Sequence, residues 1–157
     1  MTELNENTLI DDLEAIADLM EGAGVADRVR LGTLPKKLDN GGATVRTLPI
    51  KTDNLTYVSY QQIRPYQIIL YDENVPKLLD RMDKTLRLFS DTLKIPVKDG
   101  YLSIDRGIGF SETLLDEDES SYFTIGVVEA YVNRNRPQEK YDKVQEIEIN
   151  SINDEEI

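Results

Sequence analysis

The sequence predicts a single mixed α/β (α+β) domain, in which a twisted and largely antiparallel sheet packs against an N-terminal helix and one long amphipathic helix. Apolar residues recur at helical spacing in residues 8–20 and again in a later leucine-rich segment, whereas residues 63–71 and 122–132 are apolar runs of strand length. The chain has 157 residues, the size of one domain. We therefore expect one domain over residues 1–135, followed by an acidic and flexible tail over residues 136–157.

The first predicted helix covers residues 8–20 and has an acidic outer face. Its apolar residues share the opposite face, and we assign two of them, Leu13 and Ile16, to the core. Asp11 and Asp12 lie in the first turn, where their charges complement the positive end of the helix dipole. Two glycines shortly after residue 20 end the helix.

Two short strands are expected next. Residues 26–38 alternate apolar and polar side chains, and residues 44–50 follow as a second strand. An Asn-Gly-Gly sequence at residues 40–42 is typical of a tight turn, so we predict that the two strands form a hairpin. Residues 51–62 contain few apolar side chains and are interpreted as a loop or an irregular strand.

Residues 63–71 form the first strong strand. Tyr66, Ile68 and Leu70 point to one face and are assigned to the core, while the opposite face is also apolar, which places this strand inside a sheet. A long helix follows, because an Asp-Glu-Asn sequence can cap its start and Pro96 prevents its continuation. The apolar stripe of this helix consists of Leu78, Met82, Leu86, Phe89 and Leu93. We expect the first four of these to face the sheet and assign them to the core.

The last predicted elements are a short strand over residues 101–106, an acidic loop and a second strong strand over residues 122–132. The acidic loop consists of Asp116, Glu117, Asp118 and Glu119. In the strand, Phe123, Ile125 and Val127 are assigned to a buried face, and we expect the other face to be covered as well.

The side chains that most catalytic sites need are missing. The chain has neither histidine nor cysteine, so it lacks the commonest general base, thiolate nucleophiles and thiolate zinc ligands. Its two Gly-X-Gly sequences lack the further glycines and the lysine of a phosphate-binding loop. The acidic run does not fit an EF-hand, because Ser121 and Val127 stand where that loop requires glycine and glutamate. We predict no enzymatic activity and no bound cofactor or metal.

The formal net charge of −12 is concentrated at the two ends of the chain. Residues 1–24 contain seven acidic and no basic side chains, whereas residues 25–135 contain sixteen acidic and fifteen basic ones. An acidic protein repels nucleic acid, because binding relies on Lys and Arg at the phosphates. No apolar run approaches the roughly 20 residues that span a bilayer, and the N-terminus has no signal-peptide pattern. We expect a protein that stays in the cytoplasm where it is made and binds other proteins.

Two segments resemble one protein family. Residues 64–71, with the sequence Arg-Pro-Tyr-Gln-Ile-Ile-Leu-Tyr, and the amphipathic helix after them are similar to the minor capsid or tail-completion proteins of long-tailed bacteriophages. The late strand Tyr-Phe-Thr-Ile-Gly-Val-Val-Glu-Ala-Tyr-Val-Asn-Arg, residues 122–134, resembles the same family, in which such a strand follows an acidic or polar loop. The resemblance runs from residue 55 to residue 134 and rests on pattern rather than on a catalytic signature. The acidic tail departs from it.

The resemblance implies a tail terminator or head-tail joining protein, which closes into a ring of about six copies at the head-proximal end of a phage tail. Such a ring stops tube polymerisation and offers a surface for head attachment. Its partners are further copies of itself, the tail-tube protein and the head connector, with DNA only passing through and no membrane involved. The protein is then assembled in the host cytoplasm and located in the virion. In a ring, the acidic loop at residues 116–119 is expected to face the channel and discourage DNA from sticking.

Other functions are compatible with the sequence. A small acidic protein can mimic DNA and inhibit a nucleic-acid enzyme, although the near neutrality of residues 25–135 speaks against a phosphate-like surface. Competition with DNA for a nuclease or polymerase would support this alternative. A metal-dependent hydrolase that uses only carboxylates has no spaced motif behind it, and another non-catalytic binding module is the remaining alternative.

Overall fold

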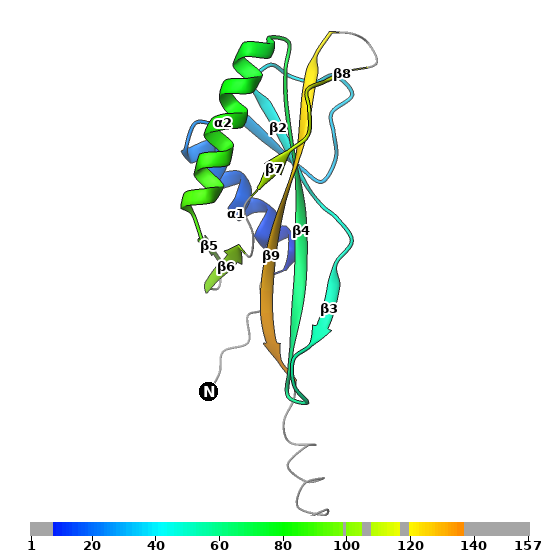
Figure 1. Ribbon diagram of the computed structural model, residues 1–157, viewed down its shortest axis with the longest axis vertical. Helices are drawn as coiled ribbons and strands as arrows, with labels where there is room; N and C mark the ends of the chain where they lie inside the picture. The colour runs from blue at the N-terminus through cyan, green and yellow to red at the C-terminus, as the bar shows by residue number, and fades with distance from the viewer. Residues whose placement is uncertain (1–7, 99, 105–107, 117–119, 137–157) are drawn as a thin grey trace, which may run out of the picture.

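Two fourteen-residue strands, β4 (Ser59–Asp72) and β9 (Tyr122–Asn135), form the centre of the protein (Figure 1). They pair antiparallel along their whole lengths, in one unbroken register. Both sequences are rich in β-branched and aromatic residues, which favour extended strands. The computed structural model describes residues 8–98, 100–104, 108–116 and 120–136.

Three strands lie on the side of β4 that faces away from β9. β2 (Gly42–Thr47) and β3 (Lys51–Asn54) pair with successive parts of β4, both antiparallel, and β1 (Arg28–Leu31) pairs with β2 in parallel. The register against β4 shifts by one residue between β2 and β3, so the chain on the β2–β3 side has one extra residue opposite β4. An extra residue of this kind is a β-bulge, which bends the strand and increases its twist. It therefore separates the part of the sheet next to β2 from the part next to β3.

Four short strands lie on the other side, beyond β9. β6 (Gly100–Ile104), β7 (Gly109–Phe110) and β8 (Leu114–Leu115) pair antiparallel with successive parts of β9. β5 (Lys94–Val97) pairs with β6 and forms the edge of the sheet. Its proline suits an edge position, since proline cannot donate a ladder hydrogen bond.

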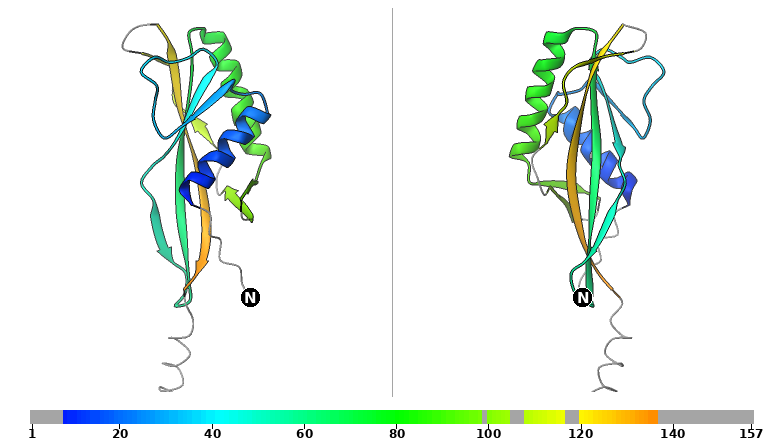
Figure 2. Two further views of the ribbon diagram at one scale, coloured as in Figure 1. Left: turned by 180° about the vertical axis from the view of Figure 1, so that it is seen from behind. Right: turned by 45° about the vertical axis from the view of Figure 1, so that its right-hand side comes forward.

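Two helices, α1 (Leu9–Gly22) and α2 (Val75–Asp91), cover the same face of the sheet (Figures 1 and 2). Thr8 and Asp11 form a capping box at the start of α1, and the Asn74 side chain accepts a hydrogen bond from the Lys77 backbone N–H at the start of α2. In the described residues, no helix is long and apolar enough to cross a membrane. The structure is the mixed α/β fold that the sequence predicts, with a mostly antiparallel sheet and two helices, one of them N-terminal.

The hydrophobic core lies between the helices and the sheet face that they cover. The predicted core residues that are buried there are Leu13, Ile16, Tyr66, Ile68, Leu70, Leu78 and Phe89. Met82 and Leu86 of α2 pack against this cluster and are only partly buried. We call the sheet face that the helices cover the inner face, and the opposite one the outer face.

The predicted core positions in β9 are wrong. Phe123 and Ile125 are half-buried and Val127 is 37% exposed, whereas the alternate residues Val128 and Ala130 are fully buried. Apart from Tyr122, the inner face of β9 carries small or medium-sized residues, and neighbouring parts of the chain pack closely above them. At Gly126, an added Cβ atom would lie 2.7 Å from the Phe110 ring. The larger apolar residues of β9 consequently point to the outer face.

The predicted hairpin of residues 26–38 and 44–50 is also wrong, because β1 and β2 are parallel. Two parallel strands cannot be joined by a tight turn. Residues 32–41 instead return the chain from the end of β1 to the start of β2. A turn does lie next to the predicted Asn-Gly-Gly sequence, where the Gly42 N–H donates to the Asp39 carbonyl. This turn leads from the connection into β2 rather than from strand to strand.

The sequence predicts several short strands weakly or not at all. Residues 51–62, for which we expect a loop or an irregular strand, contain β3 and the first residues of β4, whereas β5, β7 and β8 have no counterpart among the predicted elements. Each of these strands is short, and two of them have only two residues. Short strands of this kind form because a long neighbour offers unpaired backbone groups, so their own side-chain pattern gives little signal.

Truncation of Leu78 tests the position of the core. Leu78 is fully buried and its neighbour Leu79 is 48% exposed, although both are leucines of α2. We expect Leu78→Ala to lower the free energy of unfolding by about 2–5 kcal/mol, and Leu79→Ala to change it by less than about 0.5 kcal/mol. Urea unfolding followed by circular dichroism measures both. Equal losses in the two variants would contradict the inner face described for α2.

Candidate functional site

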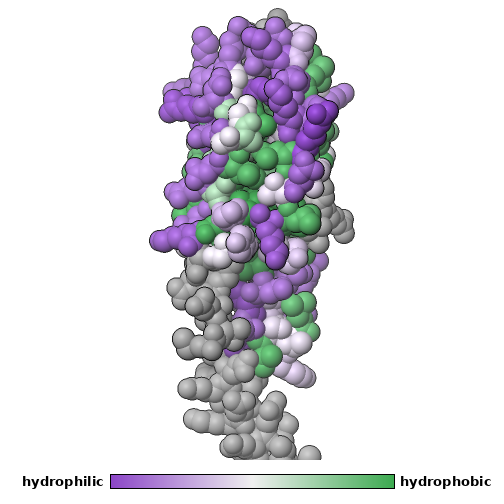
Figure 3. All heavy atoms as spheres, turned by 90° about the vertical axis from the view of Figure 1, so that its left-hand side faces the viewer, coloured by the Kyte–Doolittle hydropathy of each residue, from purple (hydrophilic) through white to green (hydrophobic). Residues whose placement is uncertain are grey.

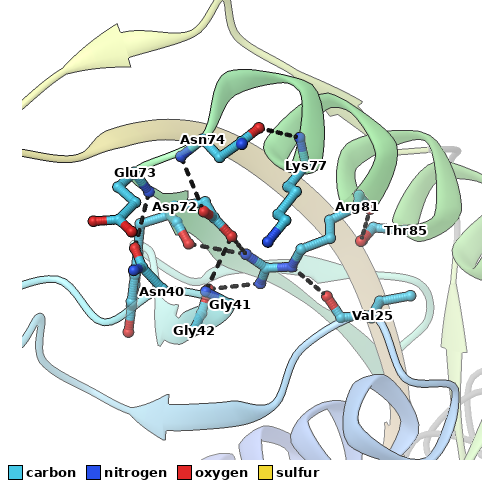
Figure 4. A network of polar contacts seen from close by, with 11 residues as sticks. Val25, Asn40, Gly41, Gly42, Asp72, Glu73, Asn74, Lys77, Arg81 and Thr85 are labelled. Atoms are coloured by element: carbon cyan, nitrogen blue, oxygen red, sulfur yellow. Dashed lines mark hydrogen bonds and ion pairs between the residues drawn. The ribbon is translucent and has the colours of Figure 1, made fainter.

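A buried arginine joins α2 to three other segments (Figure 4). The Arg81 guanidinium donates three hydrogen bonds to backbone carbonyls: Nε to Val25 at 2.8 Å, Nη1 to Tyr71 at 2.9 Å and Nη2 to Gly42 at 2.7 Å. Burial lowers the pKa of Arg81, and the charges of Asp72 and other neighbours oppose this shift. The three nitrogens are therefore occupied by groups of the chain itself.

The carboxylate of Asp72 completes this polar cluster. It accepts hydrogen bonds from the backbone N–H groups of Gly41 and Asn74, at 3.1 and 3.0 Å, and lies 3.8 Å from Arg81 Nη1. A hollow of about 700 Å³ opens beside the cluster, and its lining mixes acidic side chains with Lys77 and Arg81. Because the buried groups at its base already bind one another, we interpret the cluster as a structural junction.

A second buried ion pair fastens α1 to the centre of the sheet. The Asp12 carboxylate, fully buried on α1, accepts hydrogen bonds from Arg64 Nη1 at 2.7 Å and from the Tyr66 hydroxyl at 2.5 Å. Arg64 also donates to the Gln62 side chain. Burial, and then the hydrogen bond and charge of Asp12, raise the pKa of Tyr66. The hydroxyl therefore stays protonated and acts as a donor.

The sheet extends beyond the helices as a three-stranded arm (Figures 1 and 2). We define the arm as β3, residues 55–62 and residues 132–136. At its end, Tyr57 is 86% exposed and Leu55 is 51% exposed. Isolated apolar residues on a surface are common, but two beside each other at the end of a projection indicate a contact surface.

Arg136 holds the end of the arm in place. Its guanidinium donates to the backbone carbonyls of Thr56 and Ser59, at 2.9 and 3.3 Å, and hydrogen-bonds to the Asn54 side chain. It also lies over the Tyr60 ring, 5.2 Å from the ring centroid, a distance typical of a cation–π contact. These contacts join the residue after β9 to the turn between β3 and β4 and to the strand residues on either side of that turn.

The outer face of the sheet contains an apolar hollow, which we call the outer groove. The connection between β1 and β2 forms one side of it, and β4 and β9 form its floor. Its volume is about 310 Å³. The apolar side chains that line it are Leu34, Pro35, Leu38, Ile69, Phe123 and Ile125. Charged side chains of Lys36, Arg46 and Asp116 also line it. Two of the residues that were predicted to lie in the core thus lie in this groove.

The predicted acidic loop begins at the outer groove. Asp116 lines the groove, and its backbone N–H donates to the Ser121 carbonyl at 2.8 Å. The other three members of the run, Glu117, Asp118 and Glu119, fall outside the described residues. So do all residues of the predicted tail after Arg136. The position of the acidic loop in a ring stays a prediction.

The helix-covered side of the protein also shows apolar atoms at its surface. In Figure 3, which is turned so that the helices of Figure 1 face the viewer, apolar side chains gather in the middle of this side and hydrophilic ones surround them. The exposed helix positions are mostly charged, and two ion pairs, Asp80 with Lys84 and Asp83 with Arg87, connect successive turns of α2. Pairs of this kind contribute little stability and keep the helix surface soluble.

Neither the arm nor the outer groove is predicted by the sequence pattern. A signal for the arm is present, since Leu55 and Tyr57 are apolar residues in a polar segment that is expected to form a loop or an irregular strand. The outer groove had no such signal, because it brings together segments far apart in the chain. Within the described residues, no group of three or more Asp or Glu side chains is placed to hold a metal ion. The arrangement is suited to binding through apolar contacts.

Replacement of Tyr66 tests the buried ion pair. Tyr66→Phe removes a donor from a buried carboxylate, so we expect a loss of about 1–3 kcal/mol in the free energy of unfolding at neutral pH. The pKa of Tyr66 is raised on folding, so its stabilising contribution is complete below the unfolded pKa of about 10 and is lost at higher pH. Urea unfolding between about pH 8 and pH 11 should therefore show a shallower alkaline loss in Tyr66→Phe than in the wild type. The exposed Tyr57→Phe serves as control, and equal slopes for wild type and Tyr66→Phe would refute the role of the hydroxyl.

Comparison with known proteins finds likenesses among solved structures but none in sequence. No family model and no curated protein matches the sequence. Among solved structures, the chain is similar to a chain of a particle described as "Virion of native gene transfer agent (GTA) particle". The two chains share 17% sequence identity, with a TM-score of 0.44, over 83% of this chain and 95% of the other. The role of the arm and the outer groove is therefore inferred from their own residues.

Proposed function

We propose that this protein is a structural virion protein that caps a phage tail tube as a ring, ends tail polymerisation and provides a surface for head attachment. The observation that carries the proposal is the arm, which extends past the helix-covered core and exposes Leu55 and Tyr57 at its end. An extension with an apolar end gains little in a single copy, whereas it gives an assembled protein a contact with its neighbours. Residues 64–71 and 122–134 resemble tail-completion proteins, and this resemblance is the reason for locating the assembly at the head-proximal end of a phage tail.

The proposed ring needs no catalytic chemistry. Its work is to bind copies of itself, the tail-tube protein and the head connector, with DNA passing through. The two buried ion pairs suit this task, because a subunit in a ring must keep its shape while neighbours bind to it. In this proposal residues 1–135 are the ring-forming domain, located at the head-proximal end of the tail, and the acidic tail after them has no assigned role.

Deletion of the gene tests the capping function. Without a terminator, tube polymerisation has no stop, so particles that lack this protein should produce overlong tubes and full heads that remain unjoined. Electron microscopy of lysates shows both. The wild-type gene supplied in trans should restore joined particles with tails of normal length. Normal tails attached to heads in the deletion lysate would overturn the proposal.

We also propose that the acidic loop faces the channel of the ring and repels the phosphates of passing DNA. Neutralising all four residues, as Asp116→Asn, Glu117→Gln, Asp118→Asn and Glu119→Gln, should then slow DNA delivery while leaving assembly intact. The rate of DNA entry into host cells measures the first effect, and particle counts measure the second. The α1 variant Glu14→Gln/Asp18→Asn also removes exposed carboxylates and should deliver DNA at the normal rate. Normal delivery by the loop variant would exclude a position in the channel.

A further inference from the structure

We propose that the end of the arm of one copy binds in the outer groove of the next copy, so that each copy gives one arm and receives one. The proposal deepens the proposed function and rests on it, since it names the contact that closes the ring. Its two halves are Leu55 and Tyr57 at the end of the arm, and the apolar lining of the outer groove on the other part of the sheet.

The end of the arm is already ordered for binding. Arg136 bonds to the carbonyls of Thr56 and Ser59, and the Thr56 hydroxyl accepts from the backbone N–H groups of Val58 and Ser59. These contacts fix the backbone on both sides of Tyr57 while its side chain remains 86% exposed. A loop that is rigid before binding loses little conformational entropy on binding. The arm therefore presents Tyr57 as a fixed anchor, which is a residue type enriched at interface centres.

The outer groove has the chemistry of a receptor for such an anchor. It joins apolar side chains of the connection between β1 and β2 to those of β4 and β9, and it holds about 310 Å³. Leu34 at its margin is 42% exposed. Charged side chains lie at both surfaces: Lys36, Arg46 and Asp116 line the groove. Arg136 at the arm end can interact with the Asp116 carboxylate beside the apolar contact.

The arm cannot reach the groove of its own chain. Ile69 in the groove floor and Ser59 next to the arm end belong to the same strand, β4, and are ten residues apart. At about 3.3 Å per residue, they are separated by about 33 Å along a strand that is paired on β9 over its whole length. An arm that occupies the groove must therefore come from another copy. A contact between two different surfaces of identical chains is heterologous, and it generates rings when the rotation closes.

The size of the contact explains when it forms. An aromatic side chain buries about 150–250 Å², so the arm end covers a few hundred Å². A stable complex of free proteins buries about 1,200–2,000 Å² in total. One arm in one groove therefore does not hold two free copies together. Copies gathered on the end of a tube are at a high effective concentration, which allows the same contact to form around the ring.

Cross-linking between engineered cysteines tests the contact, because the natural chain contains no cysteine. Tyr57→Cys places a thiol at the arm end and Leu34→Cys places one at the groove. In assembled particles that contain both single variants, a short bismaleimide should give a dimer with one copy of each. Particles that contain only one of the variants should give none. The double variant Tyr57→Cys/Leu34→Cys should give a ladder of products up to the ring.

Two further variants separate this contact from random proximity. Leu79→Cys puts an equally exposed thiol on the helix-covered side, and its mixture with Tyr57→Cys should give no cross-link. Arg136→Ala in the Tyr57→Cys chain releases the arm end and should reduce the product with Leu34→Cys. Equal cross-linking to Leu79→Cys and Leu34→Cys, or none to Leu34→Cys, would overturn the proposal.

The same cross-linking is repeated on mixtures of the purified full-length variants at high protein concentration. This version of the test does not depend on tail assembly. A specific product between Tyr57→Cys and Leu34→Cys there supports the arm–groove contact even if the deletion lysate shows normal tails, in which case only the capping function fails. Conversely, capped tails of normal length without a cross-link refute the contact and leave the capping function standing.

Discussion

The unbroken pairing of β4 with β9 is the constraint on which the other parts of the structure depend. Fourteen residues of each strand are held in one register, so the position of one side chain on β9 fixes which face every other residue of that strand occupies. The short strands β2, β3, β6, β7 and β8 pair with the two free edges of this ribbon, β1 and β5 extend the sheet further, and the helices cover one face of the sheet. The same pairing stiffens the arm and keeps it distant from the outer groove.

Buried charged side chains join the helices to this ribbon. Arg81 binds carbonyls from three segments around α2, and Asp12 binds Arg64 and Tyr66 from α1. Removing one member of such a cluster leaves an unpaired group in the core, which is far more costly than replacing a surface charge. Polar groups inside the protein therefore hold the fold, while exposed apolar side chains lie at the arm end and in the outer groove, the two surfaces that we propose for contact between copies.

The two sides of the sheet differ in a way that fits a subunit of an assembly. The inner face is closed by helices and carries fully buried residues such as Val128 and Ala130, and the outer face leaves Phe123, Ile125 and Val127 partly accessible. In a monomeric protein, the solvent-facing side of an antiparallel sheet usually carries polar residues. Apolar residues there reduce the solubility of a free chain, and in the proposed ring a neighbouring copy would cover them.

The sequence by itself determined the helices, the two long strands and the mixed α/β class, because helical and strand periodicities are local properties of the chain. It could not determine which face of β9 is buried: Phe110 lies over Gly126, and only the packing of these distant residues turns Phe123 and Ile125 outward. The parallel pairing of β1 and β2 is likewise set by the tertiary structure. The arm and the outer groove also depend on the tertiary structure, because residues 34–38, 69 and 123–125 form a groove only after long-range strand pairing has brought these segments together.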